Sequence, residues 1–502
     1  MSYQLSKTRP TGNRSSSTPV HLLDDDSLLI ILSFCRLVIL DESVVSDYDA
    51  DYQPLCHSRG HSVGWNHERW WYRLIQVCRR WRYLVLDSAF HLQVSLVCAR
   101  GTPVVDMLAH FPPLPLIIDH IEHKYHVLSP EDEEGIIFAL QHRDRVRCIR
   151  IRKSLSILQR LIIALAGEFP VLEYLSIDDH RFIRPLVEFN TNLNFPETFR
   201  APHLHELLLD NFATPIESPL FTTMGNLVTL WLTSIPSSAY FHPNVLIQRL
   251  SLLPRLETLG IAFNCYNPSN DVERQLLRTP IMTQVALPNL HWLFFVGTNA
   301  YLEVLLPWVT IPLLVRLHIR LFNQMIYSVP HLLQFMSTAR NLELKTAMIT
   351  FNEYCLNVMV YSHKGTGLYT LEMNLGDTNL DWQLASAAQV FHALKTVFSA
   401  VEHLFLNLDR CNMSLEWNRQ TDWDRLLGSF GKVKTLFVGI GLDKQVSRAL
   451  QPGEGESSTE LLPELQNLFC PSGDTSQTSL HAFTLFIDAR RKAGRPVTVN
   501  HS

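Results

Sequence analysis

A short apolar pattern recurs along most of this 502-residue chain. In its clearest copy, Leu290, Leu293 and Phe295 occupy the first, fourth and sixth positions, and Pro288 with Asn289 precedes them. The same spacing starts at Val146, Leu172, Leu204, Leu227, Leu256, Leu290, Leu314, Leu344, Leu368, Val401, Val433 and Leu465. Copies follow one another at intervals of about 23 to 34 residues, the range in which one repeat forms one structural unit. Each unit has too little apolar surface to fold alone and must stack on its neighbours.

A period of this length with one short strand per unit is typical of a leucine-rich-repeat solenoid. Between copies, residues 157–166, 245–253 and 387–397 carry apolar residues at helical spacing. The pattern therefore predicts an α/β fold, an irregular solenoid with one curved parallel sheet over residues 141–502. The alternative is a set of ordinary α/β domains with similar strands, which six copies of the full leucine pattern disfavour.

Side chains alternate along a strand, so the fourth and sixth positions face the core and the fifth faces outward. In several copies the fifth position is a large apolar residue, and exposed aromatic side chains in a row are typical of a recognition surface. The predicted target-binding residues are Trp231, Phe294, Phe405, Phe437 and Phe469, together with Trp292 one pleat from Phe294. The alternative is that tails or loops cover this face and make these side chains core.

A basic cluster surrounds the first copy. Arg150 and Arg152 project from the same sheet face there, and an acidic or phosphate-bearing partner fits such a pair. A solvated basic surface is the alternative. The net charge of −5 disfavours a general nucleic-acid binder.

The first twenty residues contain no apolar segment, so we expect a disordered tail there and not a secretory signal. The longest apolar run, residues 28–40, is interrupted by Arg36 and is too short to span a bilayer. Nine scattered cysteines without a CxxC pair favour reduced thiols. We therefore expect a cytoplasmic or nuclear protein without a membrane segment.

Two helices are predicted near the N-terminus. Acidic residues 24–26 precede the apolar run 28–32, as at a helix start, and this run covers more than one helix face. After a long polar connection over residues 36–68, a second, amphipathic helix carries Trp71, Leu74, Cys78, Trp81 and Val85 on one stripe.

These segments resemble the F-box, the helical module that docks on the Skp-type adaptor of cullin-RING ubiquitin ligases. The resemblance is carried by Leu23, by residues 31–35 (ILSFC) and by residues 77–84 (VCRRWRYL). Asp24 stands where the family has proline, and the 36–68 connection is longer than usual. The order of parts is similar to that of F-box proteins with leucine-rich repeats from mushroom-forming fungi. The resemblance implies adaptor contacts at Leu23, Leu28, Ile31, Leu32 and Trp81.

The predicted organisation is a tail (residues 1–20), an F-box-like domain (21–97), a junction that caps the solenoid (98–140) and the repeats (141–502). Within the junction we expect strands at 92–97 and 114–118, a helix at 106–109 and a loop at 131–134.

No catalytic motif is present in the sequence. Cys56, His57, His61 and His67 lie close together, but their spacing is not that of a zinc site, so we interpret them as a polar loop. We expect a non-enzymatic protein without metal or cofactor. The resemblance implies a substrate-recognition subunit that binds the adaptor, through it a cullin, and an unknown protein target. The alternative is an interaction scaffold whose F-box-like start is only a structural cap.

Overall fold

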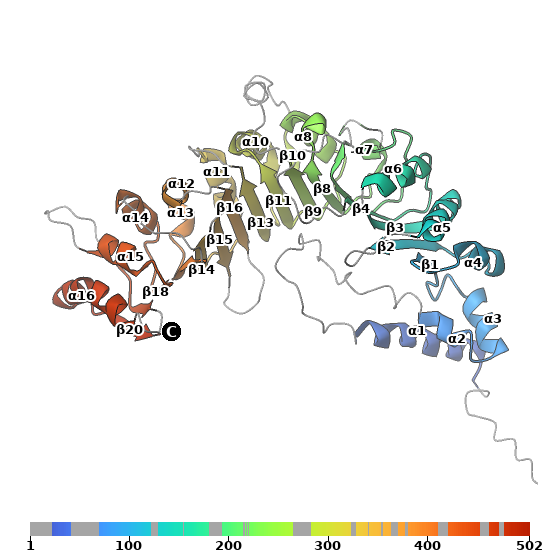
Figure 1. The fold of residues 1–502 in the computed structure, drawn as a ribbon, viewed down its shortest axis with the longest axis horizontal. Coiled ribbons are helices and arrows are strands. Elements are labelled where there is room, and N and C mark those ends of the chain that lie inside the picture. The colour runs from blue at the N-terminus through green and yellow to red at the C-terminus, as the bar shows by residue number, and fades with distance from the viewer. Residues whose placement is uncertain are drawn as a thin grey trace, which may run out of the picture. The chain divides into compact units, whose positions relative to one another are not determined.

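The computed structural model describes residues 23–41, 70–121, 129–153, 155–179, 193–213, 216, 218, 220–264, 283–322, 328–339, 341–352, 355–362, 370–376, 380–409, 420–451, 461–470 and 476–501. The chain divides into two units (Figure 1), one of Met1–His120 with Val127–Arg147 and one of Ile121–His126 with Cys148–Ser502.

The first unit packs short helices and two parallel strands around an apolar core. Leu96 of one strand pairs with Leu116 of the other. Trp71 is fully buried, and its Nε1 donates a hydrogen bond to the Ser95 carbonyl over 3.1 Å, which ties the helices to the strands. The elements are α1 (Asp25–Asp41), α2 (Trp70–Leu74), α3 (Arg79–Asp87), β1 (Leu96–Ala99), α4 (Val104–His110), β2 (Leu116–Ile121) and α5 (Pro130–Gln141).

Four predictions in this unit are wrong. Helix α1 continues to Asp41, into the connection predicted over residues 36–68, and the strand predicted at 92–97 is observed at Leu96–Ala99. The second amphipathic helix is divided into α2 and α3, because Cys78 between them has extended backbone angles (φ −159°, ψ 171°). Residues 131–134 belong to helix α5 and not to a loop. Its N-terminus has the usual start signals: Ser129 accepts a hydrogen bond from the Asp132 amide, Pro130 occupies the first turn, and acidic residues follow.

The second unit contains the repeats, and every predicted copy contains a strand. Its main sheet has the order β3-β4-β6-β8-β9-β11-β13-β16-β15-β14-β17-β18-β19-β20. The strands are β3 (Val146–Lys153, from Cys148 onward in this unit), β4 (Tyr174–Asp179), β6 (Glu206–Asp210), β8 (Thr229–Ile235), β9 (Thr258–Phe263), β11 (Trp292–Gly297), β13 (Arg316–Leu321), β14 (Thr346–Phe351), β15 (Cys355–Tyr361), β16 (Leu371–Gly376), β17 (His403–Leu408), β18 (Thr435–Val438), β19 (Asn467–Cys470) and β20 (Thr498–His501). Two small parallel pairs lie outside it: β5 (Leu193–Asn194) with β7 (Phe212–Ala213), and β10 (Val285–Ala286) with β12 (Val309–Thr310).

The core of this unit follows the repeat pattern. In the copy that begins at Leu290, Leu290, Leu293 and Phe295 are 0%, 4% and 1% exposed. The first, fourth and sixth positions of the other copies are buried in the same way wherever they are described. The α/β class and the predominance of parallel strand pairs are therefore confirmed.

The middle of the sheet departs from a purely parallel order. β15 lies between β14 and β16 and is antiparallel to both. As a result β16 is the neighbour of β13, and β14 is the neighbour of β17. The repeat spacing does not predict β15, and a sheet without this strand would place each copy beside the next one along the chain. We refer to this rearrangement as the strand exchange.

Helices connect successive strands and lie together along one side of the strand row in Figure 1. Neighbouring helices pack on one another, for example α8 on α10 and α14 on α15. They are α6 (Leu155–Ala164), α7 (Leu220–Thr223), α8 (Pro243–Leu250), α10 (Asn299–Leu305), α11 (Pro330–Thr338), α12 (Leu380–Ala393), α13 (Lys395–Phe398), α14 (Gln420–Leu427), α15 (Asp443–Leu450) and α16 (Ser476–Lys492), with 3₁₀ turns η2 (Ser237–Ala239) and η3 (Leu306–Trp308). Among the described residues, no helix is both long and apolar enough to cross a membrane.

Candidate functional site

Helix α1 of the first unit begins at a well-defined cap. The Ser27 amide donates a hydrogen bond to Asp24 Oδ1 over 2.7 Å, and the Leu28 amide donates to the Asp24 carbonyl over 3.1 Å. The first of these bonds lowers the pKa of the Asp24 carboxyl because it favours the charged form. Asp24, which stands where the F-box pattern has proline, therefore serves as the N-cap of this helix.

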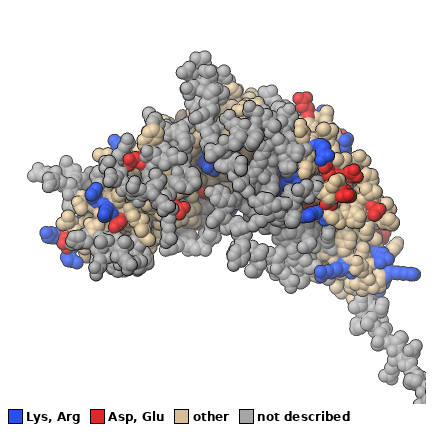
Figure 2. Space-filling view, in the orientation of Figure 1, with Lys and Arg blue, Asp and Glu red and all other residues tan. Residues whose placement is uncertain are grey.

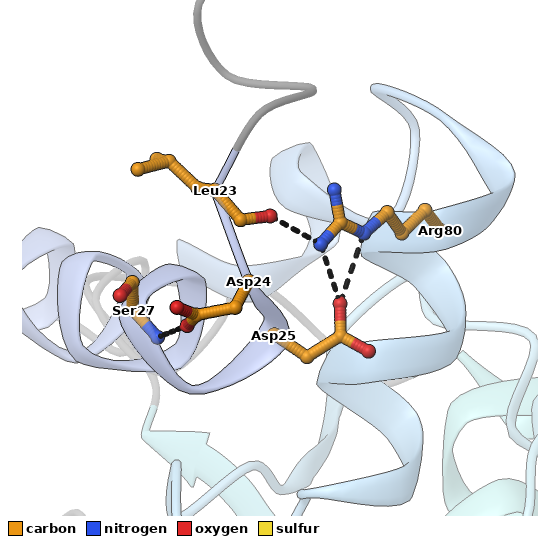
Figure 3. Close-up of polar contacts among 5 residues, drawn as sticks. All are labelled: Leu23, Asp24, Asp25, Ser27 and Arg80. Carbon is orange, nitrogen blue, oxygen red and sulfur yellow. Dashed lines mark hydrogen bonds and ion pairs between the residues drawn. The ribbon is translucent and has the colours of Figure 1, made fainter.

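Arg80 of α3 holds the start of α1 in place (Figure 3). Its Nη2 donates to the Leu23 carbonyl and to Asp25 Oδ1, each over 2.6 Å, and its Nε donates to the same Asp25 oxygen over 2.9 Å. The guanidinium thus fixes both the backbone before the helix and the first carboxylate within it. Leu23 and Trp81 are half-buried beside this junction.

The two faces of α1 differ sharply in exposure. Leu28 and Leu32 are 1% and 0% exposed, so they belong to the core of the unit and their burial removes them from the predicted contact set. Ile30, Ile31 and Phe34 are 56%, 46% and 58% exposed. Ile31 was predicted as a contact, whereas Ile30 and Phe34 were missed although Phe34 follows Ile30 at helical spacing. We call Ile30, Ile31 and Phe34 the α1 strip.

In the second unit, the outward fifth positions form one continuous row across the sheet. Strand pairing aligns them directly, as in Phe294 with His318 and Phe405 with Phe437. The sheet order of this central row is Arg150, Ser176, Leu208, Trp231, Gly260, Phe294, His318, Glu372, Met359, Met348, Phe405, Phe437 and Phe469. The fifth positions do align in one row as predicted, but the strand exchange places Glu372 before Met348 in this row, and β15 adds Met359 between them.

The tryptophans of this face are covered. Trp231 and Trp292 are 3% and 2% exposed, which corrects their prediction as exposed contacts. The Trp231 ring lies over Gly260 and stacks on Phe294 with centroids 4.8 Å apart; Trp292 is 5.1 Å from it. Phe294 remains half-buried. These aromatic side chains pack mainly on each other, and the row continues through His318, whose ring centroid is 4.5 Å from that of Phe294.

Three phenylalanines at the other end of the row stay half-buried and stack face to face. The ring centroids of Phe405 and Phe437 are 4.0 Å apart with an interplanar angle of 6°, and those of Phe437 and Phe469 are 4.3 Å apart at 15°. We call Phe405, Phe437 and Phe469 the phenylalanine ladder. Their spacing is slightly closer than the roughly 4.8 Å between adjacent strands, so the rings fill the row without gaps.

A groove of about 390 Å³ runs beside this ladder. Its lining residues come from the starts of the four adjacent strands β14, β17, β18 and β19, which the strand exchange brings together, and from Ser362 just after the end of β15. They are Lys345, Thr346, Ser362, Glu402, His403, Phe405, Thr435, Phe437, Asn467 and Phe469. The three phenylalanines were predicted from the sequence, whereas the polar lining residues were not. Thr346, His403, Thr435 and Asn467 occupy the third position of their copies, which faces the same side of the sheet as the fifth position.

The basic end of the row is less open than predicted. Arg152 Nε lies 2.6 Å from Asp178 Oδ2, and both side chains are mostly buried, at 25% and 19% exposure. Arg150 is half-buried and lies near Tyr174. Arg152 is therefore committed to an internal ion pair, and only part of the predicted basic surface faces solvent.

One buried carboxyl group at this end has a perturbed pKa. Burial, reinforced by the nearby Asp178 carboxylate, raises the pKa of Asp210 to about 7. Thr233 Oγ1 donates a hydrogen bond to Asp210 Oδ1 over 2.7 Å. Asp178 thus lies between the Arg152 cation and the protonatable Asp210, in a chain of polar side chains across β3, β4, β6 and β8.

The described residues show no cluster of three or more histidine, cysteine or acidic side chains that could hold a metal ion. Cys56, His57, His61 and His67 lie outside the described residues. On the face seen in Figure 2, acidic and basic side chains are interspersed and do not form one patch of a single sign.

No family model matches this sequence. No curated protein matches it either. Among solved structures, the leucine-rich repeat-containing protein LegL7 from Legionella pneumophila is similar to this chain with 13% sequence identity. The alignment covers 64% of this chain and 89% of that one, with a TM-score of 0.27, too low to add to what the strand register shows.

Proposed function

We propose that this chain is a target-recognition subunit of a cullin-RING ubiquitin ligase. In this proposal the F-box-like first unit binds a Skp-type adaptor, and through it a cullin, while the sheet face of the second unit binds a target protein. The chain supplies no catalytic residue, metal or cofactor, and its contribution is to hold the target near activated ubiquitin at high effective concentration. It needs neither nucleic acid nor a membrane, and it acts in the cytoplasm or nucleus.

The α1 strip is the observation that carries the proposal. A small unit has one interior, which Leu28 and Leu32 already fill, so Ile30, Ile31 and Phe34 have no role in its core. Three large apolar side chains on neighbouring positions of one helix are typical of a protein-binding surface. They lie within the segment that resembles the F-box, and Arg80 fixes the start of the helix that presents them.

The test is co-purification of the full chain with a Skp-type adaptor. We expect stoichiometric adaptor with the wild-type chain and its loss in the double variant Ile30→Asp/Ile31→Asp, since burying two carboxylates against an apolar partner is strongly unfavourable. Both positions are about half-exposed, so the variant should stay folded, which circular dichroism checks.

The matched control places the same two charges on exposed positions of the second unit. Ile163 on α6 and Leu485 on α16 are 74% and 65% exposed, so Ile163→Asp/Leu485→Asp should retain the adaptor. If a folded wild-type chain binds no adaptor, the ligase role is wrong. The chain is then better explained as an interaction scaffold whose helical start is a structural cap.

A further inference from the structure

The groove beside the phenylalanine ladder has three distinct sides. The third positions of four strands, Thr346, His403, Thr435 and Asn467, pair in register and form its floor. The ladder forms one wall. Lys345 and Glu402, which immediately precede β14 and β17, lie along the opposite side.

The floor is polar, and its side chains are not hydrogen-bonded to other described residues. Within the part of the chain that the structure describes, the side chains of Thr346, His403, Thr435 and Asn467 form no hydrogen bond. Polar groups in a partly buried position are stabilised when a partner supplies the missing donors and acceptors. A peptide backbone does so with one amide and one carbonyl per residue.

The charges along the rim are not balanced equally. Glu402 Oε2 is 3.0 Å from Lys434 Nζ, and this contact lowers the pKa of Glu402. Lys345 Nζ lies 4.0 Å from Glu343 Oε2, at the limit of an ion pair, and both side chains are about half-exposed. Lys345 also helps to lower the pKa of Glu402, but no carboxylate oxygen of the described residues lies closer than 4.0 Å to its Nζ, so Lys345 is the rim cation that a ligand can reach, at the β14 end of the groove.

The dimensions match a short extended peptide. Four strands at about 4.8 Å spacing make a floor roughly 14 Å long, which an extended chain covers with about four residues at 3.3 Å each. Side chains an odd number of residues apart point to opposite sides of such a chain, so one can approach Lys345 while those three and five positions later lie on the ring edges of Phe437 and Phe469.

We propose that this groove binds an extended peptide segment of the target, with an acidic side chain beside Lys345 and apolar side chains on the phenylalanine ladder. The inference rests on the proposed recognition role of the sheet face and specifies the chemistry of what it recognises. The acidic group pairs with Lys345, the backbone bonds to the polar floor, and the apolar side chains cover the exposed ring edges.

The experiment uses two synthetic capped hexapeptides and the full chain, with binding followed by fluorescence anisotropy. One probe carries glutamate at its first position and phenylalanine at its fourth and sixth, so that the acidic and apolar side chains point to opposite sides; the other has lysine in place of glutamate. We expect the acidic probe to bind about fivefold more tightly than the basic one, the upper end of the contribution of a half-exposed ion pair. In Lys345→Glu the preference should reverse.

Lys432→Glu is the matched control, because Lys432 is exposed and does not line the groove. It should leave the preference unchanged, while Phe437→Ala should weaken both probes. Binding of neither probe at millimolar concentration, an unchanged preference in Lys345→Glu, or an equal effect of Lys432→Glu would overturn the inference. Adaptor co-purification is measured on the same wild-type sample: adaptor bound without probe binding contradicts the groove alone, and probe binding without adaptor contradicts the ligase role alone.

Discussion

Gly260 is the position where a missing side chain shapes the sheet face. A Cβ atom there would lie 2.3 Å from Trp231 Cε3 and 2.4 Å from Cδ2, closer than atoms can approach. Because β9 has glycine at this point, the Trp231 ring crosses that strand and reaches Phe294 on β11. Glycine at this position leaves the space that the buried Trp231 ring occupies.

Gly260→Ala should therefore displace the Trp231 ring and weaken its stacking on Phe294. We expect a loss of about 1 to 3 kcal/mol in stability, as for other enlargements in packed sites. A lower thermal midpoint and a changed near-ultraviolet circular dichroism signal would show it. Gly225→Ala is the control, because no atom lies within 4 Å of a Cβ there. Equal behaviour of the two variants would contradict the packing role of Gly260.

Asp210 gives the second unit a dependence on pH near neutrality. Its pKa in the folded chain, about 7, is above the ordinary value of 3.8, so folding favours the protonated carboxyl. That stabilisation is complete below about pH 4 and is lost as the pH rises through about 7, with a slope of at most about 1.4 kcal/mol per pH unit.

Asp210→Asn should remove the loss of stability above about pH 7. The asparagine amide is neutral at every pH, and it can still donate a hydrogen bond to Asp178 and accept one from Thr233. We expect the variant to melt at a higher temperature than the wild type at pH 8 and near the wild-type temperature at pH 4. Thermal melts at both pH values measure this. Asp87→Asn, which changes an exposed residue of α3, is the control. If the melting temperatures of the wild type and Asp210→Asn change with pH in parallel, the buried carboxyl of Asp210 is not the cause of the pH dependence.

At the scale of elements, α1 has to serve two surfaces with one run of apolar residues. Leu32→Ala removes a fully buried side chain and should cost about 2 to 5 kcal/mol, whereas Ile31→Ala on the exposed face should change stability by less than about 0.5 kcal/mol. Amide hydrogen exchange of α1 in the full chain measures the difference. Equal protection in both variants would mean that the helix does not use Leu32 as its core contact.

The repeat strands could be predicted from the sequence because their signal is periodic. Apolar residues at the first, fourth and sixth positions have to face one interior, so the strand, its two faces and the aligned outward row all follow from spacing. Phe405, Phe437 and Phe469 were identified in this way, and they line the observed groove.

Elements outside the repeat pattern were harder to predict. Residues 355–361 (CLNVMVY) alternate in burial as a strand should, but they begin only 11 residues after Leu344 (355 − 344), far less than the interval between repeat copies. The break at Cys78 depends on one extended residue between two helical turns that share an apolar stripe. The exposure of each aromatic residue depends on its neighbours across the sheet, as Trp231 over Gly260 illustrates, and sequence spacing contains no information on that contact.

At the scale of the whole molecule, the candidate groove depends on the strand exchange. In a strictly sequential sheet, β16 and not β14 would border β17. Because β15 turns the chain back, Lys345 and Thr346 come to lie beside Glu402 and His403. The polar floor of the groove and the cation Lys345 on its rim could therefore not be predicted from the repeat period alone.

The exchange also has a consequence for the order in which the chain is made. A regular array can add each unit as it leaves the ribosome, but β13 (Arg316–Leu321) must wait for β16 (Leu371–Gly376), about fifty residues later, or several seconds at roughly 5 to 20 residues per second. During that interval the nascent chain presents an unpaired strand edge, which is prone to wrong pairing. Translation speed between β13 and β16 is therefore expected to affect the yield of folded protein more than translation speed elsewhere in the repeats.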